Sequence, residues 1–243
     1  VIRMCVKKVA EMIKECGNIV FFGGAGVSTE SGVKDYRSKD GLYNTVKEYG
    51  VSPEEILSHS LFFEKPEVFY DFYRKYFIVD AKPNDAHKVL AELEKMGKLK
   101  AVITQNIDGL HQAAGSKNVF ELHGSVHRNY CMSCNKQFDA EYILNSSGIP
   151  QCPCGGTIKP DVVLYEEGLD SSCVNGALSA ISNADCLIVA GTSLNVYPAA
   201  GFIKYFGGEH FVLINRDKTP ADNWADLVIH GNVGEVLSKI EVR

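Results

Sequence analysis

The sequence lacks a long hydrophobic run. Its longest fully apolar runs, such as Leu187 to Ala190, are far shorter than the roughly 20 residues that cross a bilayer. The start of the chain lacks the basic, apolar and small-residue order of a secretory signal. Positive charge is not in excess, because 25 Lys and Arg face 30 Asp and Glu, which gives a net charge of -5. We therefore expect a cytoplasmic protein that binds neither nucleic acid nor membranes.

Internal repeats and low-complexity tracts are also missing. This excludes repeat architectures and disordered arrays, and it leaves an ordinary globular chain. With 243 residues, 45% of them hydrophobic, the chain can bury one substantial core and a small satellite domain.

Short apolar runs alternate with helical patterns along the chain. Each run is wholly apolar, which is typical of strands buried on both faces of a parallel sheet, and each ends in small or polar residues. The expected strands are 19–22, 101–103, 186–190, 211–214 and 227–229, and the expected helices are 5–16, 83–97, 170–183, 197–206 and 232–240. This alternation predicts a doubly wound, Rossmann-like α/β fold whose ligands bind at the carboxyl ends of the strands.

Two segments break the alternation. Residues 42–80 are rich in Phe and Tyr without a strand signal, and residues 124–160 hold a cysteine cluster. We interpret both as insertions that together form a small domain, part helical and part zinc-binding. The Rossmann-like domain then comprises residues 1–41, 81–123 and 161–243.

Four of the eight cysteines lie within 24 residues of one another. Cys131-x2-Cys134 is followed after seventeen residues by Cys152-x-Cys154. Disulfides are not expected in a reducing compartment, whereas four thiolates suit one tetrahedral Zn²⁺. No histidine or carboxylate lies close to either cysteine pair, so we predict a closed structural site that stabilises a short polar module.

The first expected strand runs into the glycine turn Gly24-Ala25-Gly26. Such a turn lets the backbone approach a pyrophosphate. The dinucleotide fingerprint is incomplete, however, because Thr29 stands where its third glycine belongs. A strand-to-helix turn without a ligand therefore stays open. Asp35 could fix the following loop, and Arg37 could pair with a phosphate.

Polar residues follow two other expected strands. His123 comes directly after the run 119–122, and Gln105 to Asp108 follow the run 101–103. Histidine suits a general base because its pKa lies near neutrality. From position alone, a structural histidine is as good an interpretation of His123 as a general base, and residues 105–108 are interpreted as a polar turn with a helix cap at Asp108. The other six histidines suit surface or helix positions, and for His111 we expect a hydrogen bond at a helix start.

Five motifs, in order along nearly the whole chain, resemble the sirtuin family of NAD-dependent protein lysine deacylases, in its short bacterial-type form. The segment GAGVSTESGVKDYRS at 24–38 is similar to the sirtuin signature G-A-G-[IV]-S-x-x-S-G-I-P-D-F-R. The other four are TQNIDGLHQAAG at 104–115, ELHG at 121–124, KPDVVLYEE at 159–167 and GTSLNVYPAA at 191–200.

The resemblance implies an NAD-dependent lysine deacetylase that transfers the acyl group to ADP-ribose and releases nicotinamide and O-acetyl-ADP-ribose. NAD would be a co-substrate, acetyl-lysine proteins the substrates, and one structural zinc the metal. His123 and Asn106 would be catalytic, with His123 deprotonating a ribose hydroxyl. The implied NAD-binding residues are Gly24, Ala25, Gly26, Thr29, Asp35, Tyr36, Arg37, Gln105, Ile107, Asp108, His123, Gly191, Thr192, Ser193, Asn215 and Val233.

Two positions depart from the family signature, and a third bears on the acyl group. Lys34 replaces the usual proline and Tyr36 the usual phenylalanine. Family members that prefer succinyl or malonyl groups carry a Tyr-x-x-Arg pair, but here Tyr73 occupies the arginine position. We therefore expect an apolar acyl pocket that takes acetyl groups first, bordered by Tyr73 and Val163. Plain core aromatics are the alternative for the residues around Tyr73.

Three other activities compete with deacetylation. Protein ADP-ribosyl transfer and removal of longer acyl chains would use the same scaffold. The glycine turn alone would also suit an NAD-dependent oxidoreductase, although the broken fingerprint counts against it. A non-catalytic binding module is disfavoured because His123, Asn106 and Asp108 are all present.

Overall fold

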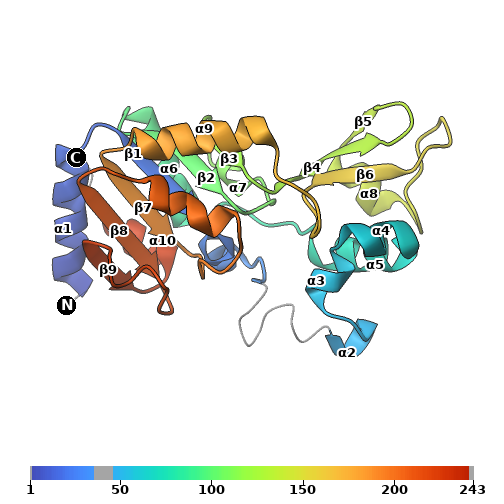
Figure 1. Cartoon of the computed structure of the whole chain (residues 1–243), viewed down its shortest axis with the longest axis horizontal. Coiled ribbons are helices and arrows are strands. Elements are labelled where there is room, and N and C mark those ends of the chain that lie inside the picture. The colour runs from blue at the N-terminus through green and yellow to red at the C-terminus, as the bar shows by residue number, and fades with distance from the viewer. Residues whose placement is uncertain (1, 36–45, 241–243) are drawn as a thin grey trace.

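A six-stranded parallel sheet forms the larger part of the molecule (Figure 1). The structure, a computed structural model of the 243-residue chain, describes residues 2–35 and 46–240. The strand order is β3-β2-β1-β7-β8-β9, which is the doubly wound order that the sequence predicts. The strands are β1 (Ile19–Gly23), β2 (Leu99–Thr104), β3 (Val119–Glu121), β7 (Cys186–Ala190), β8 (His210–Asn215) and β9 (Leu227–His230).

Helices cover both faces of this sheet. One face packs against α1 (Ile2–Glu15), α6 (Asp85–Lys95) and α10 (Val233–Leu237). The other face packs against α9 (Ser171–Ser182) and the 3-10 helix η4 (Ala199–Tyr205). Strand β1 lies between β2 and β7 and is buried along its whole length, so its apolar run meets a hydrophobic layer on each face.

The chain reverses its direction of travel across the sheet at β1. From β1 it proceeds to β2 and β3 on one side, and it later returns to β7 on the other side. The connections that leave the carboxyl ends of β1 and β7 therefore lead toward opposite edges of the sheet. Open α/β sheets bind ligands between two such strands.

A smaller body stands beside the sheet (Figure 1). It contains a three-stranded antiparallel sheet in the order β5-β4-β6 and a group of short helices. Its strands are β4 (Gly124–Cys131), β5 (Gln137–Phe138) and β6 (Ile158–Val162). Its helices are α2 (Val46–Tyr49), α3 (Pro53–Ile56), α4 (His59–Glu64), α5 (Pro66–Tyr76) and α8 (Ala140–Asn145).

The small body has a core of its own, made by both insertions. Phe62, Phe69, Tyr70 and Phe72 from the helical insertion pack with Ile158 from the cysteine-containing insertion. Neither insertion has enough apolar surface to fold alone, so each completes the other. The domain boundaries stay a prediction; β6 itself ends two residues beyond the predicted limit at 160.

Local structure differs from expectation in the small body, where the strands β4, β5 and β6 were not expected, and at two places beside the larger sheet. The glycine turn continues into two 3-10 turns, η1 (Ala25–Val27) and η2 (Thr29–Ser31), rather than into the α-helix that a strand-to-helix turn would begin. The predicted helix 197–206 is a 3-10 helix, η4. Among the described helices, none is long and apolar enough to cross a membrane.

Candidate functional site

The glycine turn after β1 lies directly against the end of β7. The Gly26 amide donates to the Gly191 carbonyl at 2.8 Å, and the Gly24 amide donates to the Ala190 carbonyl at 3.3 Å. A Cβ atom added to Gly26 would lie 2.8 Å from the Gly191 Cα. Gly191 itself has a φ of +60°, a left-handed conformation that glycine adopts freely. These glycines are required by the backbone contact at the reversal point.

A pocket of about 470 Å³ opens at this edge of the sheet. It runs from the glycine turn to the small body and gathers residues from distant parts of the chain. The predicted residues that line it are Gly24, Ala25, Gly26, Thr29, Asp35, Tyr73, Gln105, Asn106, Ile107, Asp108, His123, Val163, Gly191, Thr192, Ser193, Asn215 and Val233. Tyr36 and Arg37 lie outside the described residues, so their predicted roles receive no structural account.

His123 follows strand β3 and is positioned by the neighbouring loop. Its Nδ1 lies 2.9 Å from the Gln105 carbonyl oxygen. Because a carbonyl only accepts hydrogen bonds, Nδ1 carries the proton and Nε2 keeps its lone pair. Burial lowers the pKa of His123, and the Gln105 carbonyl opposes this only in part. The ring is therefore neutral at pH 7 and can accept a proton at Nε2.

A buried serine connects the glycine turn to the loop after β2. Ser28 is fully buried, and its hydroxyl donates to the Asp108 Oδ2 at 2.6 Å. The Ser28 oxygen in turn accepts from the Asn106 side-chain amide at 3.2 Å. The other Asp108 oxygen accepts from the Leu110 amide at 2.9 Å. This network fixes the side chains of Asn106 and Asp108 before any ligand arrives.

The His87 ring contacts the buried Ser28 hydroxyl. Its Nδ1 accepts from the Asn84 amide, so Nε2 carries the proton and faces the Ser28 hydroxyl at 3.4 Å. Burial lowers the pKa of His87 to about 4, which keeps this ring neutral. His111 packs against it with a centroid distance of 4.8 Å, and neither nitrogen of His111 has a partner among the described residues. The helix-start hydrogen bond expected for His111 was wrong.

The far end of the pocket is formed by residues after β7 and β8. Thr192 is buried, and its hydroxyl oxygen accepts from the Gln105 side chain at 3.1 Å. The Asn215 side chain donates to the Asp217 carbonyl at 2.8 Å. An Arg216 nitrogen lies 3.8 Å from an Asp35 carboxylate oxygen. These contacts set the width of the pocket on this side.

Three residues of the site, Ser28, Tyr76 and His87, were not among the site residues predicted from the sequence. Ser28 lies within the quoted signature, so its place in the motif was the available signal. Tyr76, one helical turn beyond Tyr73 on α5, also lines the pocket. No local pattern distinguishes it from the other aromatics of that helix. His87 gave no signal because its contact partner is 59 positions away.

Known proteins are similar to this chain over nearly its whole length. The Sir2 family model matches residues 24–198. The chain belongs to the Sir2 family. Proteins named NAD-dependent protein deacetylase are similar to it over almost their full length. That of Clostridium perfringens is 59% identical, covering 97% of this chain and 98% of the relative, and that of Cutibacterium acnes is 52% identical, covering 98% of each.

Solved Sir2 structures have the same fold. A Sir2 complex with a p53 peptide and NAD⁺ superimposes with a TM-score of 0.86 at 38% identity, covering 96% of each chain. A Sir2 variant with a deacetylated p53 peptide and 3'-O-acetyl-ADP-ribose gives a TM-score of 0.89 at 38% identity, with the same coverage. The predicted α/β fold is therefore confirmed.

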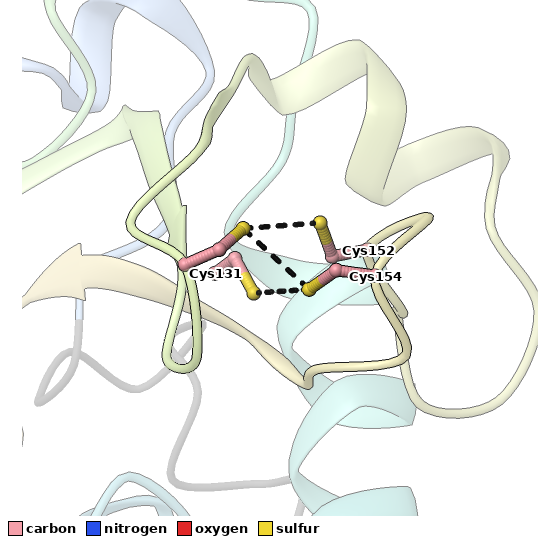
Figure 2. Close-up of side chains that lie close together, drawn as sticks. Cys131, Cys152 and Cys154 are labelled. Atoms are coloured by element: carbon pink, nitrogen blue, oxygen red, sulfur yellow. Dashed lines mark hydrogen bonds between the residues drawn. The ribbon is translucent and has the colours of Figure 1, made fainter.

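The four cysteines of this Sir2-family chain converge in the small body (Figure 2). Their sulfur atoms all lie within 4.8 Å of one another. The Sγ distances are 3.5 Å for Cys131–Cys154, 3.7 Å for Cys134–Cys152 and 3.5 Å for Cys134–Cys154. Four thiolates about 2.3 Å from a tetrahedral zinc are separated by about 3.8 Å, so the cluster fits one Zn²⁺.

The zinc site joins the two ends of the cysteine-containing insertion. Cys131 ends strand β4, and Cys152 precedes strand β6. The group holds four cysteines and, in the part of the chain that the structure describes, no fifth ligand. A closed set of four ligands leaves no place for a reactive water, which favours a structural role.

We expect Cys152→Ser to lose the zinc and to unfold at a lower temperature, because three thiolates hold the ion less tightly and binding energy contributes to folding. Elemental analysis should show about one zinc per wild-type chain and much less in the variant. Cys173→Ser, which changes a cysteine outside the cluster, is the matched control. Full zinc content and an unchanged melting temperature in Cys152→Ser would contradict the structural role.

Proposed function

We propose that this protein removes acetyl groups from lysine side chains of other proteins and consumes NAD in doing so. The observation that carries the proposal is His123, a neutral histidine whose Nδ1 is committed to the Gln105 carbonyl. Its Nε2 is left to take a proton within a pocket that the glycine turn also lines. A base of this kind suits deprotonation of a ribose hydroxyl.

NAD, when bound, supplies the ADP-ribose that accepts the acyl group, and nicotinamide leaves. The chain's own residues would bind and orient it. The glycine turn would admit the pyrophosphate close to the backbone, and Thr192, Ser193, Asn215 and Val233, which line the same pocket, would bind the adenosine half. Asn106, Ile107 and Asp108 lie beside His123, where the nicotinamide end belongs, and the Ser28 network holds two of them in place.

The acyl-lysine would enter from the side of the small body. The Val163 amide donates to the His123 carbonyl at 3.0 Å, so this residue adjoins the base. The Val163 carbonyl has no partner among the described residues, and it can accept a hydrogen bond from a substrate amide. Strand addition by the substrate peptide, as predicted from the sequence, would use this group.

Acetyl should be preferred over succinyl because the pocket offers no cation to an acyl carboxylate beside Tyr73, as far as the described residues show. Tyr73 is fully buried, with its ring between those of Phe69 and Phe77. Arg74 points elsewhere and donates to the Ile143 and Gly148 carbonyls and the Ser146 hydroxyl. A buried carboxylate without a charged partner is strongly disfavoured.

Three further expectations stay predictions. They are the cytoplasmic location, the absence of nucleic-acid and membrane partners, and the division into a Rossmann-like and a small domain. ADP-ribosyl transfer to protein and removal of longer acyl chains would use the same pocket, and no feature of the described residues favours either over deacetylation.

Incubation with NAD and an acetyl-lysine peptide should release nicotinamide and O-acetyl-ADP-ribose in equal amounts, both measured by mass spectrometry. His123→Ala should reduce the rate by roughly 100-fold or more, since a general base contributes about 10²–10⁴-fold. A succinyl-lysine peptide should react more slowly than the acetyl peptide.

Three results would contradict this proposal. They are nicotinamide release that does not depend on the peptide, acetate without O-acetyl-ADP-ribose, and undiminished activity in His123→Ala. Faster turnover of the succinyl peptide would contradict the acyl preference alone.

The pH dependence of kcat/KM should reflect the lowered pKa of His123. Because folding lowers the pKa of His123, the basic form persists as the pH falls below the usual histidine value of about 6.5. The acid limb of kcat/KM should therefore inflect below about 6.5 when the peptide carries no group that titrates in this range. An inflection above about 7 would show that another group, or a protonated His123, controls the reaction.

A further inference from the structure

The loop that follows β6, residues 163–167, contains an unusual backbone conformation. Glu166 has a φ of +76°, which lies in the left-handed region that residues other than glycine rarely adopt. Such a conformation persists only where surrounding contacts impose it, and these residues cluster at ligand-binding elements. We call residues 163–167 the substrate loop.

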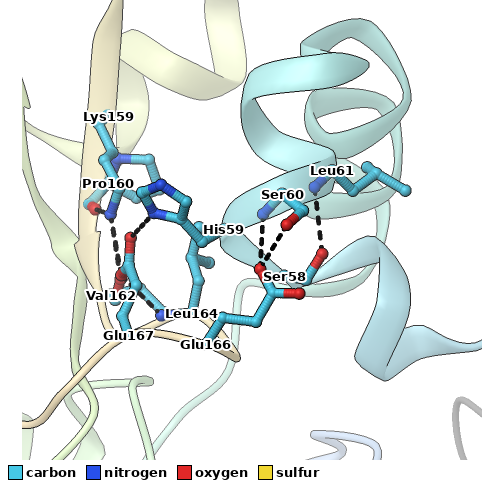
Figure 3. A network of polar contacts seen from close by, with 10 residues as sticks. All are labelled: Ser58, His59, Ser60, Leu61, Lys159, Pro160, Val162, Leu164, Glu166 and Glu167. Atoms are coloured by element: carbon cyan, nitrogen blue, oxygen red, sulfur yellow. Dashed lines mark hydrogen bonds and ion pairs between the residues drawn. The ribbon is translucent and has the colours of Figure 1, made fainter.

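Contacts from helix α4 hold Glu166 in this conformation (Figure 3). Its Oε2 accepts hydrogen bonds from the Ser60 amide at 2.8 Å and from the Ser60 hydroxyl at 2.7 Å. Both donors lower the pKa of the Glu166 carboxyl, so it is charged at neutral pH. These two hydrogen bonds join the Glu166 side chain to the helical insertion, although Ser60 is 106 positions away in the sequence. We call this pair of hydrogen bonds the clasp.

The residues on either side of Glu166 bind the same segment. The Tyr165 amide donates to the Leu57 carbonyl at 3.0 Å, and the His59 amide donates to the Tyr165 carbonyl at 2.9 Å. Glu167 accepts from His59 at 2.9 Å, and its other oxygen accepts from the Leu164 amide at 3.0 Å. The substrate loop is thus fastened to the start of α4 by contacts at three consecutive residues.

The opposite end of the substrate loop reaches the base. The Val163 amide donates to the His123 carbonyl at 3.0 Å, and all five loop residues line the pocket. The Val163 carbonyl is therefore positioned by contacts at both ends of the loop. These are the Val163–His123 hydrogen bond at one end and the Glu166–Ser60 hydrogen bonds at the other.

We propose that Glu166 is a positioning residue for the acyl-lysine substrate. Its clasp on Ser60 orders the substrate loop in advance, so the peptide does not have to order it on binding. Glu166 itself need not touch the substrate. This inference rests on the proposed function, since it names how that pocket receives its peptide.

The test is a steady-state comparison of wild type with Glu166→Ala. We expect KM for the acetyl-lysine peptide to rise about three- to fivefold, because the variant loses two hydrogen bonds to a charged group and both are exposed to solvent. KM for NAD and kcat should stay within about twofold, because uniform binding affects KM alone. Glu64→Ala is the matched control, since it removes an exposed glutamate from α4, the helix that Glu166 binds.

Two further variants distinguish the effect of losing the Glu166–Ser60 hydrogen bonds on the peptide KM from the effect of backbone strain at position 166. Glu166→Gly removes the carboxylate but suits the left-handed conformation, so it should raise the peptide KM as well. Glu166→Gln keeps an acceptor oxygen and should recover most of the affinity. Wild-type KM in Glu166→Ala, or equal increases for peptide and NAD, would overturn the proposal. So would a wild-type KM in Glu166→Gly.

Amide hydrogen exchange tests the clasp without any reaction. In the absence of substrate, Glu166→Ala should accelerate exchange at Ser60 and in the substrate loop, and Glu64→Ala should not. Unchanged exchange would overturn the clasp. If the wild type fails to deacetylate while exchange responds as expected, the clasp holds and the proposed function fails, so the two failures are distinguishable.

Discussion

The close approach of two backbones at the centre of the sheet is the constraint on which the rest of the site depends. The Gly26 amide meets the Gly191 carbonyl at 2.8 Å, which brings the turn after β1 against the end of β7. There is no room between them for a side chain. Because the chain reverses its direction of travel across the sheet at this point, one pocket can receive groups from β1, β2, β3, β7 and β8.

The second half of the site comes from the small body. Its zinc cluster and its core of aromatic side chains make a rigid support, and β6 leads from it into the substrate loop. The loop adjoins the base through Val163, while Glu166 and its neighbours bind the start of α4. In the proposed reaction, His123 stands where the nucleotide half and the peptide half adjoin, and a reaction between the two ligands would require this arrangement.

Elements with a strong local pattern could be predicted from the sequence. Buried runs such as 186–190 mark strands because parallel strands are apolar on both faces, and the spacing of the four cysteines alone indicates a zinc site. The Ser28–Asp108 and Ser60–Glu166 contacts could not be predicted, because each joins residues at least 80 positions apart. The antiparallel sheet of the small body was missed because β4 pairs with β6, which follows it by about thirty residues, and because polar residues and Pro160 interrupt the apolar pattern of both strands.

The most direct test of this account is the affinity of Gly26→Ala for NAD, measured by isothermal titration calorimetry. The added Cβ would push the turn away from Gly191, so binding should weaken roughly tenfold or more while the protein stays folded. Gly17→Ala is the control, because a Cβ atom there meets nothing within 4 Å. Wild-type affinity in a folded Gly26→Ala variant would contradict the claim that this backbone contact creates the nucleotide site.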